Sequence, residues 1–407
     1  IGLAIKNNRD LRVATLNIEQ VRAQYQIRRA DQFPSVGLAA AGNRQPDANG
    51  GIANTYSVGL ALSSWEIDFF GRLGSLKEAA LAQYLASEEA RHAAQTSLVA
   101  AVASSWLSLQ TNDELLALTE RTVATRQDSL RLSRLRFDNG ATSALDLRQA
   151  ESLTAAAQSA LAQQRRARAL DLNALTLLVG QTPPAALLPA PPTMPEAVKA
   201  NGVTVPSAPV PAASMLREVP AGLPSDLLTR RPDIRQAEQQ LIAANANIGA
   251  ARAAFFPRIS LTASAGTASG SLSGLFESGS WGFTLAPQAL LPIFDAGRNN
   301  ANLGSAKAAR DIAVAQYEKA IQTAFREVAD ALAGSATLGD QLSAQQVQAS
   351  AEAERFRLAE LRYRNGVSSF LDVLDAQRSL FTTQQALAQT RLAQQQNQVA
   401  LYKALGG

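Results

Sequence analysis

The sequence contains few of the residues from which most catalytic and metal-binding sites are built. Its 407 residues include no cysteine and a single histidine, His92. The lack of cysteine excludes a disulfide framework and thiol chemistry, and the histidine count excludes a metal site made of His and Cys. We interpret His92, which lies in a helical pattern, as a helix-surface residue, and we expect no cofactor, no metal and no enzymatic activity.

Aromatic residues, net charge and long apolar runs are also scarce. Aromatic residues form 5% of the chain although 46% is hydrophobic, mostly Ala, Leu and Val, so long, thin, packed helices are expected. The net charge is only +4, with no dense basic patch, which argues against nucleic-acid binding. No apolar run reaches the roughly 18 residues of a transmembrane helix.

One long motif occurs twice. Residues 135–147 read LRFDNGATSALDL, and residues 361–373, 226 positions later, read LRYRNGVSSFLDV. Two further pairs keep nearly the same offset: Phe33-Pro34 with Phe256-Pro257, and Gly71-Arg72 with Gly297-Arg298. Two copies of a unit of about 180 residues therefore fill the chain, which predicts two internal structural repeats.

Each copy combines helices with two short strands. Repeat one, 1–180, is expected to hold a helix over 3–31, a β-hairpin at about 35–64, a long helix at about 71–138, a tip and a return helix. Apolar and small residues alternate in both strands of that hairpin, as in a strand with one apolar face. Repeat two, 225–407, is expected to follow the same order, with Ser225 or Asp226 as N-cap, a hairpin at about 258–291 and a long helix at about 296–363. The segment between them, 181–224, holds 11 of the 17 prolines and is interpreted as a linker.

The duplicated motif predicts a tight helix–turn–helix tip. Both long helices end in Asn-Gly, which favours a left-handed C-terminus. Ser143 with Asp146, and Ser369 with Asp372, have the spacing of capping boxes that start the return helices.

Four strands are too few to close a barrel, which needs about eight. An open sheet cannot lie in a membrane, because its edge groups find no hydrogen-bond partners there. The chain is therefore expected to oligomerise, with eight strands in a dimer or twelve in a trimer, and the long helices would form a hollow tube. A soluble pair of hairpins is the alternative.

The repeated halves, the stretch GLPSDLLTRRPDIR at 222–235, the motif at 361–377 and the closing LYKALGG resemble the TolC-like outer-membrane efflux channels, most closely the OprM group. This resemblance covers essentially the whole chain. It implies a homotrimer in the bacterial outer membrane, with a shared 12-stranded barrel, four strands per chain, and a coiled-coil helical tunnel in the periplasm. It also implies a passive exit duct for drugs and other small toxic compounds, joined through a periplasmic adaptor protein to an inner-membrane resistance-nodulation-division transporter.

Members of this group usually carry a lipidated N-terminal cysteine. Since the sequence starts at Ile1 inside a helical pattern and without Met, we expect the natural N-terminus to precede it. Whether the protein is a lipoprotein is left open at this stage.

The tip holds the predicted functional residues. Asp372 and Asp375 are three residues apart and so share a helix face, and in a trimer each would form a ring of three carboxylates. Capping is an alternative role for Asp372, so Asp375 is the preferred gate residue, and Leu371 would add an apolar constriction. The resemblance implies the same constriction, formed by Leu371, Asp372 and Asp375.

The resemblance also implies a latch between the repeats and a docking surface for the adaptor. The latch positions correspond to Asp146 and Tyr363, while a second family link uses an Arg where this chain has Ser368. The adaptor-contact candidates, for which plain turn residues are the alternative, are Asn139, Gly140, Thr142, Asn365, Gly366, Val367 and Ser368.

Three other functions remain open from the sequence. Within the family, the duct could serve type I protein secretion or metal-ion efflux, although the two methionines, Met194 and Met215, argue mildly against copper or silver. Outside it, the chain could be a structural coiled-coil protein without a pore.

Overall fold

The computed structural model describes residues 1–46, 51–189, 198–200, 203–205 and 229–407. Much of the expected proline-rich linker, together with Ser225 and Asp226, lies outside these residues. The chain forms two compact units, and each unit takes segments from both halves of the sequence. The helical unit comprises Ile1–Val13, His92–Arg231 and Gln322–Gly407, and the sheet unit comprises Ala14–Arg91 and Pro232–Ile321.

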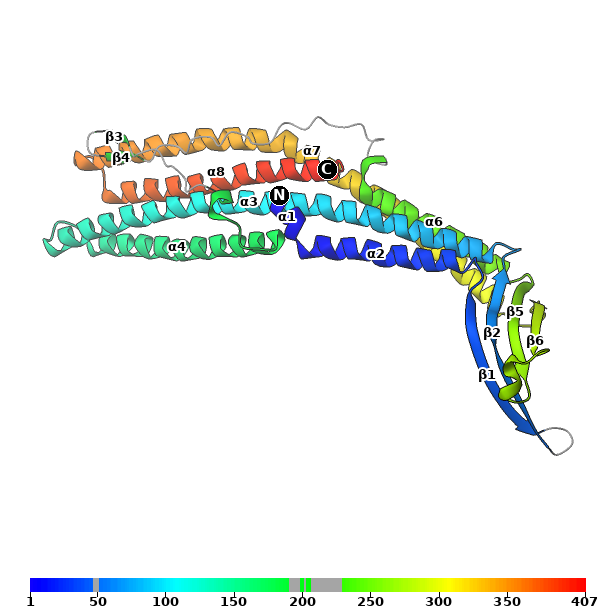
Figure 1. Cartoon of the computed structure of the whole chain (residues 1–407). Helices are drawn as coiled ribbons and strands as arrows, with labels where there is room; N and C mark the ends of the chain where they lie inside the picture. Colours follow the sequence, from blue (N-terminus) through cyan, green and yellow to red (C-terminus); the bar gives the residue numbers. More distant parts are fainter. Residues whose placement is uncertain (47–50, 190–197, 201–202, 206–228) are drawn as a thin grey trace. The chain divides into compact units, whose positions relative to one another are not determined.

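The sheet unit holds four antiparallel strands in the order β1-β2-β5-β6 (Figure 1). The four strands expected from the sequence are therefore confirmed. The strands are β1 (Val36–Pro46), β2 (Ile52–Ile67), β5 (Arg258–Ser269) and β6 (Trp281–Leu290), with a 3-10 turn η2 (Ser273–Phe276) before β6. Helices α2 (Arg9–Ala30) and α6 (Pro232–Ala253) and the first parts of α3 and α7 complete this unit.

Both strands of the first hairpin extend further than the side-chain pattern indicates. The segment 42–53 is expected to be a turn region, but β1 continues to Pro46, which pairs with Ile52. The cause is that ladder hydrogen bonds use backbone groups, which polar residues such as Asn43 and Arg44 supply as well as apolar ones do.

The pairing register gathers the apolar side chains on one face of the sheet. Leu38 of β1 pairs with Leu60 of β2, Leu60 pairs with Ala265 of β5, and Ala265 pairs with Phe283 of β6. Since side chains alternate along a strand, the residues two positions away lie on this same face. These side chains are largely exposed in the single chain, as at Leu38 (78%) and Phe283 (72%).

A β-bulge near the C-terminal end of β2 keeps the apolar side chains that follow it on this same face. The register of β2 against β5 shifts between Leu62 and Trp65, and Ser64 there has a φ of 26°. The extra residue lets Trp65 pair with Leu261, as Leu62 pairs with Ala263. Without it, Trp65 would point to the opposite face.

That opposite face is lined by small residues where β2 meets β5. Gly59 and Gly266 pair directly, and a Cβ added to Gly266 would lie 2.5 Å from the Gly59 Cα. Because the obstacle is backbone, no side chain can move aside to make room. The small face expected from the sequence is thus required by the close approach of two strands.

The helical unit is built from long helices that are matched in length between the halves. Helices α3 (Arg72–Asp138) and α7 (Arg298–Arg364) have 67 residues each, about 100 Å at 1.5 Å per residue. The return helices α4 (Ala144–Val179) and α8 (Phe370–Ala404) have 36 and 35 residues. A 3-10 turn η1 (Ala185–Leu187) and the short strands β3 (Val198–Ala200) and β4 (Val203–Val205) follow α4. No helix in the described part of the chain combines the length and the hydropathy of a membrane span.

The helical segment expected over 3–31 is present, but Asn8 divides it into α1 (Gly2–Asn7) and α2. Asn8 is extended, with a ψ of 131°, and its Oδ1 accepts a hydrogen bond from the Leu11 N–H at 2.8 Å. Its Nδ2 donates to the Leu178 carbonyl at 2.9 Å. Asn8 is therefore a buried N-cap that ties the start of the chain to α4.

The helical unit has small cores of aliphatic residues rather than one large core. One cluster joins Leu11, Leu109 and Leu175, which are 5%, 1% and 3% exposed. Another, near the α7–α8 turn, joins Phe356, Val373, Ala376 and Leu380. The low aromatic content of the sequence fits this arrangement of thin, separate clusters.

We expect Gly266→Ala to lower the stability of the sheet, because its Cβ would press on the backbone of β2. Overpacking of this kind costs about 1–3 kcal/mol. Gly282→Ala is a matched control in the neighbouring strand, since a Cβ there meets nothing within 4 Å. Thermal unfolding of the purified variants in detergent, followed by circular dichroism, measures the difference. Equal melting temperatures for the two variants would contradict the close approach of β2 and β5.

Candidate functional site

The two inter-helix turns at the tip have the same backbone structure. Gly140 and Gly366 have φ values of 68° and 73°, so the left-handed helix ends expected from Asn-Gly are confirmed. In the first turn the Ala141 N–H bonds to the Arg136 carbonyl, and in the second the Val367 N–H bonds to the Arg362 carbonyl. This 6→1 pattern ends both long helices and reverses the chain.

The adaptor-contact candidates lie on these turns and are largely exposed. Asn139, Gly140, Asn365 and Gly366 are exposed, and Val367 is 66% exposed. The Nδ2 atoms of Asn139 and Asn365 both donate to the carbonyl four residues earlier, so these side chains also brace their turns.

The other two contact candidates, Thr142 and Ser368, are half-buried. The Thr142 hydroxyl is bonded to Asp146, and the Ser368 Oγ is buried without a hydrogen-bond partner. Ser368, where the resemblance implies an Arg link, therefore makes no side-chain hydrogen bond within the described residues.

The two expected capping boxes differ. In the first, Ser143 accepts from the Asp146 N–H at 3.1 Å, and the Asp146 carboxylate accepts from the Ser143 N–H at 3.3 Å, so the box is complete. In the second, the Asp372 N–H donates to Ser369 Oγ at 3.4 Å, and α8 has this one side-chain cap bond. The complete box expected at Ser369 and Asp372 is therefore only half formed.

Asp146 is held by the first turn. Its carboxylate accepts hydrogen bonds from the hydroxyls of Ser143 at 2.8 Å and Thr142 at 2.9 Å. These hydrogen bonds lower the pKa of Asp146 below its usual value, and the bond from Ser143 has the largest effect. Asp146 is thus an ionised helix cap in this chain, and none of its bonds in the described part of the chain goes to Tyr363.

The ring of Tyr363 contacts one aromatic side chain and one arginine. It packs on Phe370, with ring centroids 5.0 Å apart, and the Arg136 guanidinium lies over its face at 5.1 Å. Since Arg136 belongs to α3 and Tyr363 to α7, a cation–π contact joins the two sequence halves at the tip. Sequence reasoning missed Arg136, although it lies inside the repeated motif.

The two gate aspartates have different electrostatic surroundings. Asp375 is half-buried and bonded on both oxygens, to Arg355 of α7 at 2.7 Å and to Arg378 of its own helix. Asp375 in turn raises the pKa of Arg355 through their hydrogen bond. Asp372 is exposed, and its carboxylate has no hydrogen bond or ion pair within the described residues. The uncompensated negative charge at the start of α8 is therefore that of Asp372, next to Leu371, which is 46% exposed.

We expect Ser143→Ala to loosen its turn more than Ser369→Ala, because only the first cap is a complete box. Loss of a Ser N-cap costs about 1 kcal/mol, roughly a fivefold rise in local opening. Amide hydrogen exchange in the first turns of α4 and α8 measures both variants. If Ser369→Ala raised exchange in α8 more than Ser143→Ala raises it in α4, the first cap would not be the stronger one.

Comparisons with known proteins agree with this architecture. The sequence profile described as "Outer membrane efflux protein" matches residues 1–181 and 223–407. The solvent efflux pump outer membrane protein SrpC of Pseudomonas putida is 49% identical, over 100% of this chain and 84% of the relative. The antibiotic efflux pump outer membrane protein ArpC of the same organism is 48% identical, over 100% and 82%.

A solved structure extends the similarity to three dimensions. The open state of the Neisseria gonorrhoeae MtrE outer membrane channel superposes with a TM-score of 0.86 at 40% identity, over 100% of this chain and 88% of that chain. The family expected from the sequence motifs is confirmed: the chain belongs to the outer membrane efflux protein family, and it is an outer-membrane component of an efflux system.

Proposed function

We propose that three copies of this chain form a passive exit duct, with a shared 12-stranded barrel in the outer membrane and a helical tunnel in the periplasm. The observation that carries this proposal is the open sheet. Within the described residues, β1 pairs only with β2 and β6 pairs only with β5, so each outer strand has an unpaired edge.

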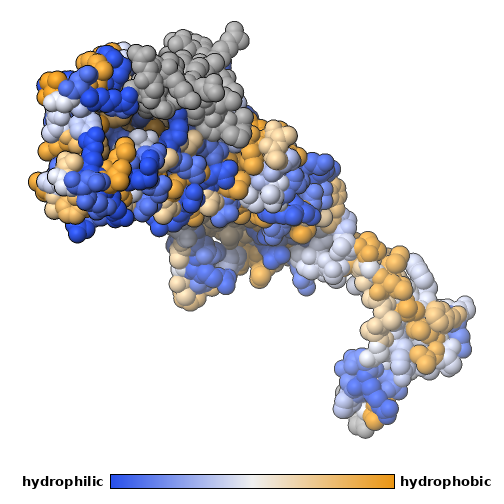
Figure 2. Space-filling model, turned by 90° about the vertical axis from the view of Figure 1, so that its left-hand side faces the viewer, coloured by the Kyte–Doolittle hydropathy of each residue, from blue (hydrophilic) through white to orange (hydrophobic). Residues whose placement is uncertain are grey.

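The apolar face of the sheet supports its position in a membrane. Trp281, Phe283 and Leu285 of β6 are 67%, 72% and 62% exposed in the single chain. Figure 2 shows hydrophobic residues along the sheet and hydrophilic ones at its hairpin end, where β1 carries Asn43 and Arg44. Open strand edges are not tolerated in lipid, so the edge of β6 must pair with β1 of the next copy, and three copies supply twelve strands.

The gate in this proposal lies at the start of α8. Leu371 would form the apolar constriction, and the uncompensated carboxylates of Asp372 would form the charged ring. Asp375 would act differently, since its two arginine partners neutralise it and tie α8 to α7 through Arg355. The expected preference for Asp375 as the charged gate is therefore replaced by Asp372.

The partners and substrates follow from the relatives. SrpC and ArpC are named as outer-membrane proteins of solvent and antibiotic efflux pumps. We infer that this duct expels small organic toxic compounds and that an inner-membrane resistance-nodulation-division transporter and a periplasmic adaptor complete the pump. The exposed Asn-Gly turns at 139–140 and 365–366 would receive the adaptor.

Single-channel recording in a planar bilayer tests the duct and its gate. We expect a small wild-type conductance, which Asp375→Ala raises because the link between α7 and α8 is lost. Asp372→Asn should leave the conductance nearly unchanged but reduce the preference for cations, because it removes the unpaired charge. Asp340→Asn, on α7 away from the tip, is the control.

The possible results separate the alternatives. A discrete conductance that Asp375→Ala does not raise, with a cation preference that Asp372→Asn does not reduce, would retain the duct and place the constriction elsewhere. A trimer in detergent that gives no conductance would support a structural coiled-coil protein without a pore.

The latch between Asp146 and Tyr363 is tested by Tyr363→Phe. This variant keeps the ring that packs on Phe370 and Arg136 and removes only the hydroxyl. If the hydroxyl holds the closed tip, the conductance should rise above that of the wild type. A wild-type conductance would exclude the latch and leave the ring contacts as the role of Tyr363.

A further inference from the structure

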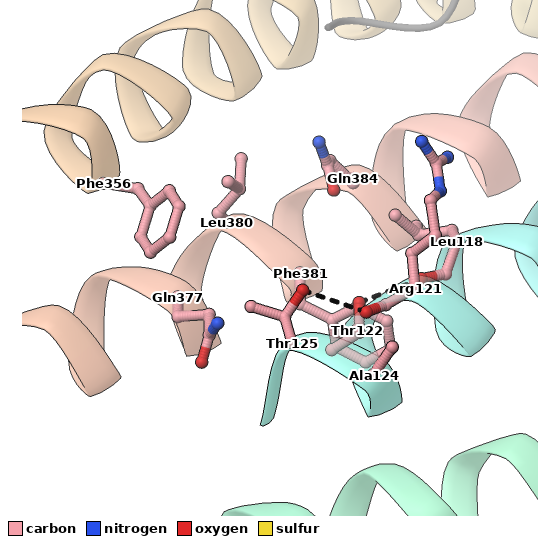
Figure 3. Close-up of a pocket in the computed structure, with 10 residues that line it drawn as sticks. All are labelled: Leu118, Arg121, Thr122, Ala124, Thr125, Phe356, Gln377, Leu380, Phe381 and Gln384. Atoms are coloured by element: carbon pink, nitrogen blue, oxygen red, sulfur yellow. Dashed lines mark hydrogen bonds between the residues drawn. The ribbon is translucent and has the colours of Figure 1, made fainter. Parts of the chain in front are cut away.

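A partly open cavity of about 200 Å³ lies in the helical unit, between α3 on one side and α7 and α8 on the other (Figure 3). Most of its wall is apolar, with Phe356 and Leu380 only 7% and 3% exposed. From α3 it is lined by Leu118, Arg121, Thr122, Ala124 and Thr125. None of the gate, latch or adaptor-contact residues lines it.

The wall of the cavity carries the guanidinium of Arg121, a half-buried residue. The Nη2 atom of Arg121 is buried and has no hydrogen-bond partner, and the guanidinium makes a single long bond, from Nε to the Ala117 carbonyl at 3.4 Å. Burial lowers the pKa of Arg121 below its usual value. An arginine remains charged under these conditions, so a positive charge with one unsatisfied nitrogen lies at the wall of the cavity.

Within the described residues, Arg121 forms no ion pair with a carboxylate. The residues that line the cavity include no Asp or Glu. Glu120, next to Arg121 in sequence, is paired with Arg165 at 3.3 Å. A second buried cation, Arg126, lies over the ring of Phe381 at 5.4 Å, and Phe381 also lines the cavity. A buried, unpaired charge is costly, and an anion bound beside it would remove that cost.

The size and the walls of the cavity select an aromatic anion. A cavity of roughly 150 Å³ holds a benzene ring. This cavity is somewhat larger and has the rings of Phe356 and Phe381 in its wall, so it has room for one ring with a carboxylate. Figure 3 shows the side chains of Arg121 and Gln384 extending in the same direction. The end of the cavity that these two residues line therefore has nitrogen donors from both.

The other end of the cavity carries an unpaired acceptor. Gln377 is 9% exposed, and its Oε1 is buried without a hydrogen-bond partner. Gln377 and Gln384 are seven residues apart on α8 and therefore lie on one face of the helix, about 10 Å apart. That separation suits a ring with a carboxylate at one end and a hydroxyl at the other.

We propose that this cavity binds a small aromatic carboxylate: Arg121 pairs with the carboxylate, Phe356 and Phe381 enclose the ring, and Gln377 accepts a hydrogen bond from a para hydroxyl. The bound molecule would contact α3 from the first half of the sequence and α7 and α8 from the second. None of the proposed gate residues lines this site, so its occupancy is tested independently of the gate.

Isothermal titration calorimetry with 4-hydroxybenzoate tests the site on the purified full chain in detergent. We expect saturable binding to the wild type and at least tenfold weaker binding to Arg121→Met, which keeps the side-chain length and removes the charge. Arg131→Met is the matched control, because Arg131 is on the same helix with a side chain that is 71% exposed, and its affinity should be that of the wild type. Acetate, which has no ring, and phenol, which has no carboxylate, should each bind at least tenfold more weakly than 4-hydroxybenzoate.

Two further measurements keep the result decisive. Arg121→Met should unfold at a temperature no lower than the wild type, since it removes an unpaired buried charge. Gln377→Leu should also weaken binding of 4-hydroxybenzoate while leaving that of benzoate unchanged. The proposal is overturned if the wild type shows no binding at millimolar ligand, if Arg121→Met binds as tightly as the wild type, or if acetate binds as tightly as 4-hydroxybenzoate.

Discussion

The unpaired backbone along the outer edges of β1 and β6 is the constraint on which the proposed assembly depends. Each chain supplies four strands whose apolar side chains gather on one face, and this face is exposed in the single chain. Neither the edges nor the face can be satisfied by the chain that makes them, because four strands cannot close on themselves. The unit that is stable in a membrane is therefore expected to be the closed assembly of several chains.

The helical unit also lacks a large core of its own. Its helices are long and rich in alanine, and its buried clusters are small, such as the one around Leu109 and the one around Phe356. Contacts between the two sequence halves in this unit are polar in part. Arg136 over Tyr363 at the tip and Arg391 beside Glu114 at 3.2 Å are examples, and such contacts can be exchanged without exposing a large core.

The tip shows how one repeated motif acquires two roles. Asp146 and Asp372 occupy equivalent positions, yet the first is held by two hydroxyls and the second is free of them. The difference lies in which hydroxyls bond to the carboxylate, since both turns have a hydroxyl residue at each of these two positions. Residue 142 is a threonine whose hydroxyl bonds to Asp146, whereas the equivalent Ser368 leaves its Oγ without a partner. The two repeats thus share the turn, while the hydrogen bonds to the carboxylate are made only in the first.

The sequence by itself determined the elements that depend on local chemistry. Alternating apolar residues predicted the four strands, Asn-Gly predicted both left-handed helix ends, and Ser143 with Asp146 predicted a complete cap, because each feature involves residues close together in the chain. The duplicated motif and the stretch at 222–235 were sufficient to identify the family. Local patterns did not, however, predict the break at Asn8, whose bond to the Leu178 carbonyl joins positions far apart in sequence.

Only the tertiary structure decided which charges are neutralised. Asp375 was the preferred gate residue because its position is not needed for a cap, yet Arg355, twenty residues earlier, reaches it across the α7–α8 pair. Arg121 would be expected to be an ordinary solvated residue of a long helix, but packing against α7 and α8 buries its Nη2 without a partner. Charge compensation depends on the distances between side chains on different helices. These distances are set by how the helices pack, and the sequence alone does not give them.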